Sequence, residues 1–178
     1  MQKPHPFEIY EPLPPQLKPA DPLLILVADA IIGILLEKFP HSKIEHFGST
    51  AVPDLAGSGI IDLMMLCPSG QHSTVSAVLE EMGFQSPRPN DLVYANYPLK
   101  VALYTFEGKT FPIHLHILDE NSPRVDEFRT FRDRLRLDAG FRAAYQDLKR
   151  SCFAKRNVSS ADYARLKSEF IQKSLNKT

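Results

Sequence analysis

An aspartate inside an apolar run is the feature that most restricts how this chain can fold. Residues 59–66 read GIIDLMML, and their Ile, Leu and Met side chains predict a central strand of a sheet. A carboxylate in the middle of such a strand is costly to bury unless it pairs with a basic group or holds a metal ion. Met64, two residues on and therefore on the same sheet face, supplies no second acid. Asp62 is thus either a structural ion-pair partner or a ligand in a site.

A Gly-Ser-Thr turn precedes this strand. Residues 42–47 are short and β-like, and they end at Gly48, so Ser49 and Thr50 follow a strand directly. Glycine lets the backbone approach a ligand closely, and exposed N–H groups with two hydroxyls suit a phosphate. A capped turn without a ligand explains the same residues, and the chain has no Walker pattern GxxxxGK[ST]. Gly48, Ser49 and Thr50 are therefore candidate phosphate-binding residues.

Two histidines lie on a later predicted strand, residues 110–118. His114 and His116 are separated by Leu115, so both project from one face of that strand. Beside Asp62 they would form a two-histidine, one-carboxylate set that suits Zn, Mn or Fe better than Mg. Alternatively one imidazole serves as a general base near neutral pH, or both only hydrogen-bond within the sheet. We take Asp62, His114 and His116 as candidate catalytic and metal-binding residues, on condition that their strands are neighbours.

Arginines share one face of a predicted helix that begins near Ser122. Arg129, Arg132 and Arg136 follow the spacing i, i+3, i+7. Arginine binds phosphate in a bidentate manner, so Arg132 and Arg136 are candidate phosphate ligands, although a solvated helix face explains the same pattern.

Charge is unevenly divided along the chain, although the total is zero. Residues 1–120 contain 7 Lys and Arg and 14 Asp and Glu, whereas residues 121–178 contain 14 and 7. The last third is therefore at +7 and the rest at −7, which indicates either solvated helix faces or a basic wall facing an anionic ligand. The zero total gives no overall attraction to nucleic acid or membranes, and no aromatic-interleaved basic motif indicates nucleic-acid binding.

An apolar helix is predicted near the start of the chain. Asp21 and Pro22 form a helix-start signal, and the helix should run to about Phe39. Its interior is interrupted by Asp29, and the apolar part is shorter than the roughly 20 residues that a membrane span needs. Because it is apolar almost all round, the helix is expected to be buried or to form a homo-oligomer through residues 22–38.

The remaining elements predict an α+β fold in one domain over residues 1–178. They are a proline-rich arm at 1–20, a helix at 72–82, strands at 91–96, 100–106 and 110–118, a hairpin turn at 107–109, and helices from 122 to 178 with a break at Gly140. Helices and strands do not alternate regularly, which favours α+β over a parallel α/β sheet.

The cysteine content and the chain start bear on location. Cys67 and Cys152 lie far apart and form no CxxC pair, so neither a disulfide framework nor a zinc site is expected. No basic and apolar leader opens the chain, and together with 43% hydrophobic and 24% charged residues this predicts a soluble cytoplasmic protein.

Several segments resemble the GrpB-like family. The sequence IEHFGSTAVPDLAGSGIIDL at 44–63 resembles its signature, and HLHIL at 114–118 resembles its HLH strand. FRTFRDRLR at 128–136, YQDLK at 145–149 and YARLKSEFI at 163–171 resemble its C-terminal helices. The resemblance covers about residues 42–171. It implies a nucleotidyltransferase-like mixed sheet with flanking helices and a C-terminal helical extension.

The resemblance also implies roles for particular residues. Gly48 and Ser49 would hold a triphosphate, Asp62 would be the first metal-binding carboxylate, and the HLH strand would lie where related transferases carry a third acid. The chain departs from the family pattern at Ser58-Gly59, where Lys-Pro is usual, and at Asp54, where glycine is usual. A lysine at position 58 could have neutralised phosphate or paired with Asp62.

These features lead to one functional hypothesis and two alternatives. The hypothesis is a nucleotidyltransferase that acts from a nucleoside triphosphate onto a small-molecule acceptor, with Mg²⁺ or Mn²⁺ on Asp62. The first alternative is a non-catalytic module that binds a nucleotide or a coenzyme A-like ligand, since some family members are fused to a dephospho-coenzyme A kinase. The second is a protein-interaction domain that uses the apolar first helix.

Overall fold

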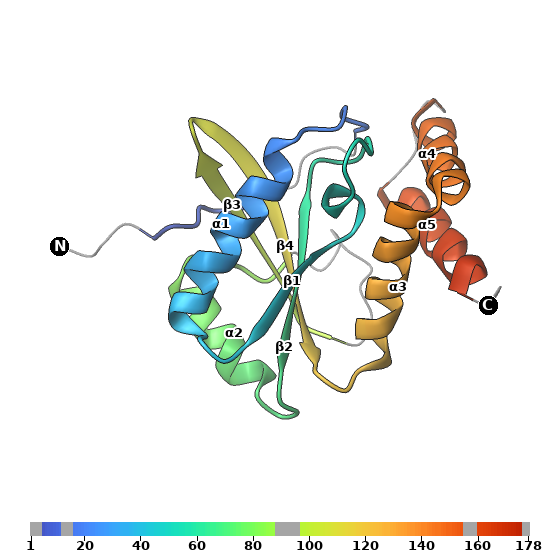
Figure 1. The fold of residues 1–178 in the computed structure, drawn as a ribbon. Helices are drawn as coiled ribbons and strands as arrows, with labels where there is room; N and C mark the ends of the chain where they lie inside the picture. The colour runs from blue at the N-terminus through green and yellow to red at the C-terminus, as the bar shows by residue number, and fades with distance from the viewer. Residues whose placement is uncertain (1–4, 12–15, 88–96, 155–159, 176–178) are drawn as a thin grey trace.

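A four-stranded mixed sheet forms the centre of the computed structural model, which describes residues 5–11, 16–87, 97–154 and 160–175 (Figure 1). The strands are β1 (Lys43–Phe47), β2 (Ile61–Cys67), β3 (Leu99–Phe106) and β4 (Lys109–Asp119), in the order β1-β2-β4-β3. β1 runs antiparallel to β2, β2 parallel to β4, and β3 antiparallel to β4. The predicted α+β class and mixed sheet are confirmed.

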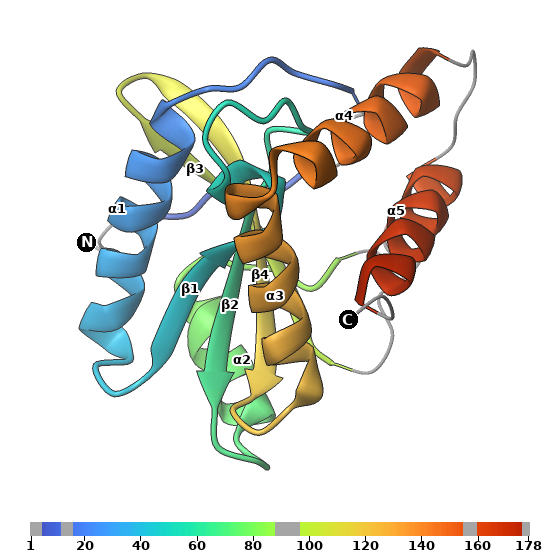
Figure 2. The same cartoon turned by 45° about the vertical axis from the view of Figure 1, so that its right-hand side comes forward.

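Helices cover both faces of this sheet. They are α1 (Leu23–Lys38), α2 (His72–Glu81), α3 (Pro123–Leu137), α4 (Ala139–Ala154) and α5 (Ser160–Leu175), with a short 3₁₀ turn η1 (Ser49–Ala51). α1 and α2 lie on one face and α3 on the other, with α4 and α5 beyond α3 (Figures 1 and 2). The faces are called here the closed face, under α1 and α2, and the site face, towards α3.

Alternation along the two central strands divides their side chains between these faces. The closed-face residues of β2 and β4 are Ile61, Leu63, Met65, Ile113, Leu115 and Ile117, all buried in the largest apolar cluster. Asp62, Met64, His114 and His116 therefore project from the site face. The predicted central strand is confirmed, and the single polar residue in its apolar run is the one that turns away from the main core.

The first helix is buried along one side only. Asp21 caps it, because its carboxylate accepts a hydrogen bond from the Leu23 backbone N–H at 3.0 Å. Val27, Ile31 and Leu35 are fully buried against the sheet, whereas Leu26 is 58% exposed. No helix in the described ranges is long and apolar enough to cross a bilayer. Self-association through residues 22–38 stays a prediction.

One predicted turn is confirmed, one predicted boundary is shifted, and one predicted strand lies outside the described residues. Glu107 and Gly108 have φ angles of 49° and 76°, which confirms a tight hairpin turn between β3 and β4. The break between α3 and α4 falls at Asp138 rather than Gly140, since the Asp138 side chain accepts a hydrogen bond from the Phe141 N–H at 2.8 Å and so caps α4. The strand predicted at 91–96 falls outside the described ranges.

Candidate functional site

Parallel pairing of β2 with β4 brings the candidate metal ligands together. Asp62 lies opposite His114 in the register, and Met64 lies opposite His116. His114 Nδ1 is 3.9 Å and His116 Nε2 is 3.8 Å from the same carboxylate oxygen, Asp62 Oδ1. The two strands are therefore neighbours, as the proposed ligand set required, although Asp62 and His114 are more than fifty positions apart in the chain.

Asp62 is buried and ionised. Its side chain is 12% exposed, and burial by itself would raise the pKa of the carboxyl group. The opposing attractions of His116, Lys167 and His114 outweigh burial and lower the pKa to about 2. A negative charge held at this depth beside two imidazoles is the arrangement expected of a cation-binding or catalytic group.

His114 and His116 differ in their surroundings. Burial, with the nearby charges of His116 and Lys167, lowers the pKa of His114 to about 4 despite the attraction of Asp62, so His114 is neutral at pH 7. His114 Nε2 lies 3.5 Å from the hydroxyl of Tyr10, on the N-terminal arm, and the two rings meet edge to face. His116 Nδ1 lies 3.3 Å from the hydroxyl of Tyr97. The arm therefore closes one side of the histidine pair, a contact that its proline-rich sequence did not predict.

Gly48 lies directly against the Asp62 carboxylate. Its φ angle is 73°, and a Cβ atom at this position would be 2.5 Å from Asp62 Oδ2. Both the positive φ and the close approach require glycine. The glycine of the predicted phosphate turn and the aspartate of the central strand thus belong to one site.

The two hydroxyls of the turn are used differently. The Thr50 hydroxyl donates to the Ile60 carbonyl and also lies 3.0 Å from His46 Nε2, so it holds the turn to the end of the loop that leads into β2. Ser49 is 7% exposed. Among the described residues, its hydroxyl has no hydrogen-bond partner. The Ser49 hydroxyl lies against the Gly57 backbone, because a Cβ atom built on Gly57 would be 2.8 Å from Ser49 Oγ.

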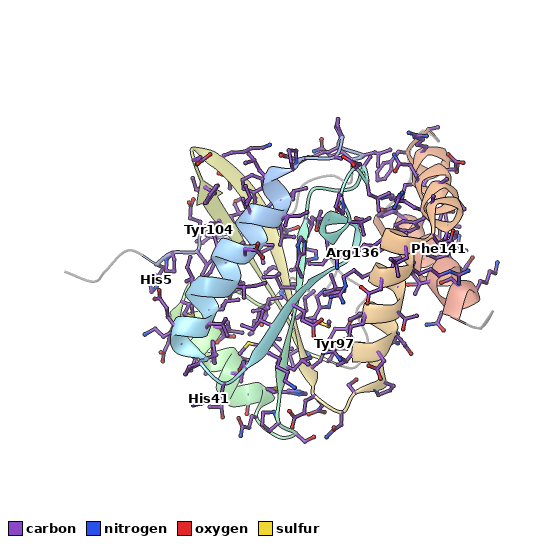
Figure 3. The ribbon with its side chains drawn as sticks, viewed as in Figure 1. His5, His41, Tyr97, Tyr104, Arg136 and Phe141 are labelled. Atoms are coloured by element: carbon purple, nitrogen blue, oxygen red, sulfur yellow. The ribbon has the colours of Figure 1, made fainter. Side chains whose placement is uncertain are left out.

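A cavity of about 260 Å³ opens over Asp62 between the site face, α3 and α5. Asp62, Gly48 and His116 lie on the side of the sheet. The apolar and aromatic lining residues are Phe47, Tyr97, Phe128, Phe131 and Ile171, and the polar residues contributed by the helices are Arg124, Glu127, Lys167, Ser168 and Gln172. Figure 3 shows Tyr97 in the space between the strands and α3. The Phe47 and Phe128 rings stack with centroids 4.4 Å apart. A concave aromatic chamber with a few polar groups at its base is typical of a small-molecule site.

Lys167 on α5 is a site residue that the sequence reasoning missed. It lines the same cavity as Asp62, and its charge helps to lower the pKa of that carboxyl group. It lies within the segment that resembles the family's last helix, four residues after Tyr163 and on the same side of the helix. A basic residue on the otherwise apolar face of an amphipathic helix was the signal that could have identified it.

The arginines of α3 bind groups of β1 and η1 beside the site. Arg132 donates to Glu45 at 3.1 Å and to the His46 carbonyl at 3.3 Å, and Arg129 binds the same glutamate. Arg136 donates two hydrogen bonds to the Ala51 carbonyl, at 3.2 and 2.8 Å, and Figure 3 shows it between α3 and the turn. None of the three lines the cavity over Asp62. Their contacts position β1 and η1; direct phosphate binding by Arg132 or Arg136 stays a prediction.

The position of a second acid is closed. Met64 is fully buried in an apolar cluster with Phe47, Leu66, Leu118 and Val125. It therefore packs beneath α3 and does not face the cavity. The lack of a carboxylate two residues after Asp62 is thus matched by an apolar environment around position 64.

The donor atoms around Asp62 meet the requirements of a metal ion only in part. Mg²⁺ prefers oxygen ligands, and among the described residues two carboxylates line the cavity: Asp62, and Glu127, which accepts a hydrogen bond from Arg124 at 2.9 Å. The two imidazoles beside Asp62 suit Mn²⁺ or Zn²⁺ better. In the described part of the chain, no three His, Cys, Asp or Glu side chains are arranged as a ready-made metal site. The two findings agree: each imidazole approaches one oxygen of Asp62, but the three groups do not surround a common point. An ion would need oxygens from a ligand to complete its shell.

The chain was compared with known proteins. The sequence model described as "GrpB protein" matches residues 15–177. UPF0157 protein SCO7215 of Streptomyces coelicolor is 32% identical over 133 residues, which cover 72% of this chain and 64% of that protein. UPF0157 protein PA4798 of Pseudomonas aeruginosa is 30% identical over 167 residues, covering 91% of this chain and 66% of that protein. The matched part of the chain thus spans no more than about two thirds of either relative.

Solved structures support the fold. The crystal structure of conserved protein GrpB from Enterococcus faecalis has a TM-score of 0.68 at 19% identity, covering 90% of this chain and 99% of that one. Cid1 poly(U) polymerase with MgGTP bound has a TM-score of 0.51 at 20% identity, covering 70% of this chain and 41% of that one. The sheet is therefore of the nucleotidyltransferase-like kind, as the resemblance implied. With a family match over nearly the whole chain, this protein belongs to the GrpB family.

Proposed function

We propose that this protein transfers a nucleotidyl group from a nucleoside triphosphate to a small-molecule acceptor, with Asp62 as the cation-binding carboxylate. One observation carries the proposal: a buried, ionised aspartate lies against a glycine turn at the base of an aromatic cavity. A carboxylate alone would fit a structural ion pair. A carboxylate that opens onto a ligand-sized chamber beside a phosphate-type turn fits a nucleotide site better.

The cavity suggests how the nucleotide would lie. The aromatic walls formed by Phe47, Tyr97 and Phe128 suit a nucleoside, because a base has an apolar face that stacks on rings. The phosphates would then extend towards Gly48 and Ser49, where the backbone N–H groups of the turn lie. Lys167, on the opposite wall, would offset their negative charge.

His116 is the better placed of the two histidines to accept a proton. It lines the cavity, whereas His114 is covered by Tyr10 and does not. In the transfer step an acceptor hydroxyl oxygen would form a bond to the α-phosphorus, and the bond from that phosphorus to the bridging oxygen would break. Pyrophosphate would leave with the electron pair, and the hydroxyl proton would pass to His116 Nε2, beside Asp62.

A divalent cation bound by Asp62 and phosphate oxygens would neutralise the phosphates and orient the attack, while His116 accepts the proton. Mg²⁺ and Mn²⁺ both accept such oxygen ligands. The residues of the chain would supply the rest: the turn holds the phosphates, the arginines of α3 hold the turn, and the rings exclude water from the reacting groups.

One observation favours a second candidate function, that of a non-catalytic nucleotide-binding module. Met64 lies where a second carboxylate would be expected, and its apolar cluster leaves no room for one. A site that lacks this second carboxylate on the central strand can hold a cation with a nucleotide without turning it over. Binding and turnover therefore have to be measured separately.

The test is a melting titration with ATP, CTP, GTP and UTP, each with and without Mn²⁺. A ligand that binds only the folded state raises the melting temperature, and a concentration of 100 times Kd stabilises by about 2.7 kcal/mol. We expect a metal-dependent shift with at least one nucleotide, loss of that shift in Asp62→Asn, and pyrophosphate release when acceptors are added. Asp29→Asn, at an exposed position on α1, is the matched control and should behave as wild type.

Three outcomes decide between the functions. A metal-dependent shift with pyrophosphate release supports the transferase. A shift that persists in Asp62→Asn and gives no pyrophosphate supports the binding module. No shift with any of the four nucleotides, with or without metal, contradicts both.

A further inference from the structure

The helices over the cavity contribute polar side chains that the proposed transfer step does not use. α3 contributes Arg124 and Glu127, and α5 contributes Ser168 and Gln172. Asp62 and the glycine turn border the same cavity from the sheet. If the phosphates of a nucleotide lie at the turn, its base lies towards this polar wall.

Glu127 is held by one neighbour only. Its Oε2 accepts a hydrogen bond from Arg124 Nη1 at 2.9 Å, one helical turn earlier in α3. In the described part of the chain, no other group donates to this carboxylate. A carboxylate has about four lone-pair sites, so most of its capacity to accept hydrogen bonds stays open to a ligand in the cavity.

Aromatic rings lie directly beside Glu127. Phe128 is the next residue of α3 and lines the same cavity. Its ring stacks on Phe47, with centroids 4.4 Å apart, and meets Tyr97 edge to face at 6.4 Å. Since the two phenylalanine rings offer no hydrogen-bonding groups, a base packed against them would find partners for its polar edge among the side chains next to them.

The polar side chains of this wall differ in what they can distinguish. Gln172 and Ser168 each donate and accept, so they suit any base edge. Arg124 only donates and Glu127 only accepts, and their contact places a donor beside an acceptor. Such a pair is complementary to an edge where an amino group lies beside a ring acceptor, as in adenine, cytosine and guanine. Uracil has no amino group, and a carboxylate repels its carbonyl oxygens.

We propose that Glu127 and Arg124 form the base-recognition site of the cavity and select nucleoside triphosphates whose base carries an exocyclic amine. Glu127 accepts a hydrogen bond from the amine, and the remaining donors of Arg124 bind the ring acceptor beside it. The inference rests on the proposed function, which makes the ligand a nucleotide, and it names the class of nucleotide.

The experiment measures the binding of two matched pairs of nucleotides by calorimetry, with Mn²⁺ present. The pairs are ATP with ITP and CTP with UTP. Within each pair, an amine beside a ring acceptor is exchanged for a carbonyl beside a ring N–H. We expect wild type to bind the amine-bearing member of at least one pair about tenfold or more tightly, since one good base contact discriminates by that order.

Glu127→Gln should remove this preference. The amide keeps the length of the side chain and still accepts from Arg124, but it can turn its N–H groups towards a carbonyl. The two members of the preferred pair should then bind within about threefold of each other. Melting should stay close to wild type, because partly exposed ion pairs contribute little to stability.

Glu169→Gln is the matched control. Glu169 also pairs with an arginine on its own helix, accepting from Arg165 at 2.9 Å, but neither residue lines the cavity. The same exchange there should leave the preference of the protein unchanged.

Each result bears on one proposal or the other. Loss of the preference in Glu127→Gln but not in Glu169→Gln supports the inference. Equal binding within both pairs by wild type, or a preference for ITP or UTP, overturns it and leaves the nucleotide site standing. A preference for the amine that persists in Glu127→Gln also overturns it, because other residues would then read the base. Failure of all four nucleotides to bind overturns the proposed function and this inference together.

Discussion

The two faces of the central strands have different roles: one forms the main apolar core and the other forms the base of the candidate site. On the closed face, the central residues of β2 and β4 are apolar and buried in the largest apolar cluster; they are Ile61, Leu63, Met65, Ile113, Leu115 and Ile117. On the site face, the intervening residues include Asp62, His114 and His116 beneath an open chamber. One strand therefore contributes to stability through every other residue and to chemistry through the residues between.

The difference lies in what each helix layer covers. The closed face is covered by helices that present apolar side chains. Its contribution to the free energy of unfolding comes from the burial of apolar surface. α3 and α5 stand over the site face at a distance that leaves about 260 Å³. A costly buried carboxylate is tolerated there because histidines, a lysine and a glycine backbone surround it.

The site face is itself divided, and Met64→Asp should reveal that division with the largest effect. Met64 shares its face with Asp62 but is sealed in an apolar cluster. An aspartate there would move a carboxylate from water into an apolar cluster, so we expect a loss of about 4 kcal/mol or more in the free energy of unfolding. Urea denaturation measures it, with Met64→Leu as a control that should cost less than about 1.5 kcal/mol.

The opposite result would change the view of the site. If Met64→Asp retained wild-type stability and bound Mn²⁺ more tightly, position 64 would open onto the cavity. The site face would then be polar throughout, and the missing second acid would be a simple substitution rather than a closed position.

The closed face should respond to truncation with a somewhat smaller loss. Leu63 is adjacent to Asp62 but fully buried on the other side of the sheet. Leu63→Ala should destabilise the fold by about 3 kcal/mol, because it leaves a cavity that rigid strands cannot fill. Chemical denaturation gives the value, and Leu137→Ala, at a side chain 87% exposed, should stay within about 0.5 kcal/mol of wild type. A loss below about 1 kcal/mol for Leu63→Ala would argue against a rigid closed face.

Acid should lower the free energy of unfolding through one buried histidine on each face, His46 and His114. Burial lowers the pKa of His46, on the closed-face side of β1, from 6.5 to about 4, as it does for His114 on the site face. The unfolded chain takes up these protons below pH 6.5 and the folded chain only near pH 4, so stability is full above pH 6.5 and falls as the pH decreases towards 4. Each group should account for about 2 kcal/mol after allowance for solvent screening.

Single variants separate the two contributions. The free energy of unfolding, measured by urea denaturation from pH 7.5 to 4, should depend about half as steeply on pH in His46→Gln, and likewise in His114→Gln. An unchanged slope in either variant would mean that the histidine is already protonated in the folded protein. A slope that vanished in one of them would place the whole effect on one face.

Much of the fold could be predicted from local patterns. The start of α1 at Asp21-Pro22, the hairpin at Glu107-Gly108 and the cap at Ser122 are decided by residues a few positions apart, so the sequence displays them directly. The family was also recognisable, because its signature is a continuous segment. The break between α3 and α4 was predicted two residues too late, at Gly140. Glycine was expected to end the helix, but Asp138 separates the two helices and caps the second one.

The site was predictable only in part. Asp62, Gly48 and the histidine pair could be identified because a polar residue in an apolar run and a glycine after a strand are local anomalies. The contacts of Arg136 with Ala51, of Tyr10 with His114 and of Lys149 with Ala56 join residues about 85 to 104 positions apart. No pattern along the chain distinguishes these side chains from others of their kind on solvated faces.

By itself, then, the sequence determined which residues could not be ordinary: an aspartate that burial makes costly, a glycine that must adopt positive φ, and histidines two residues apart on a strand. The tertiary structure decided which of them meet. Pairing of β2 with β4 brought the histidines to the aspartate, and the packing of α3 and α5 placed Lys167 over it and left the cavity open. The physical reason is that burial and charge interactions depend on distances in space, and these are set by packing between elements that the chain order does not specify.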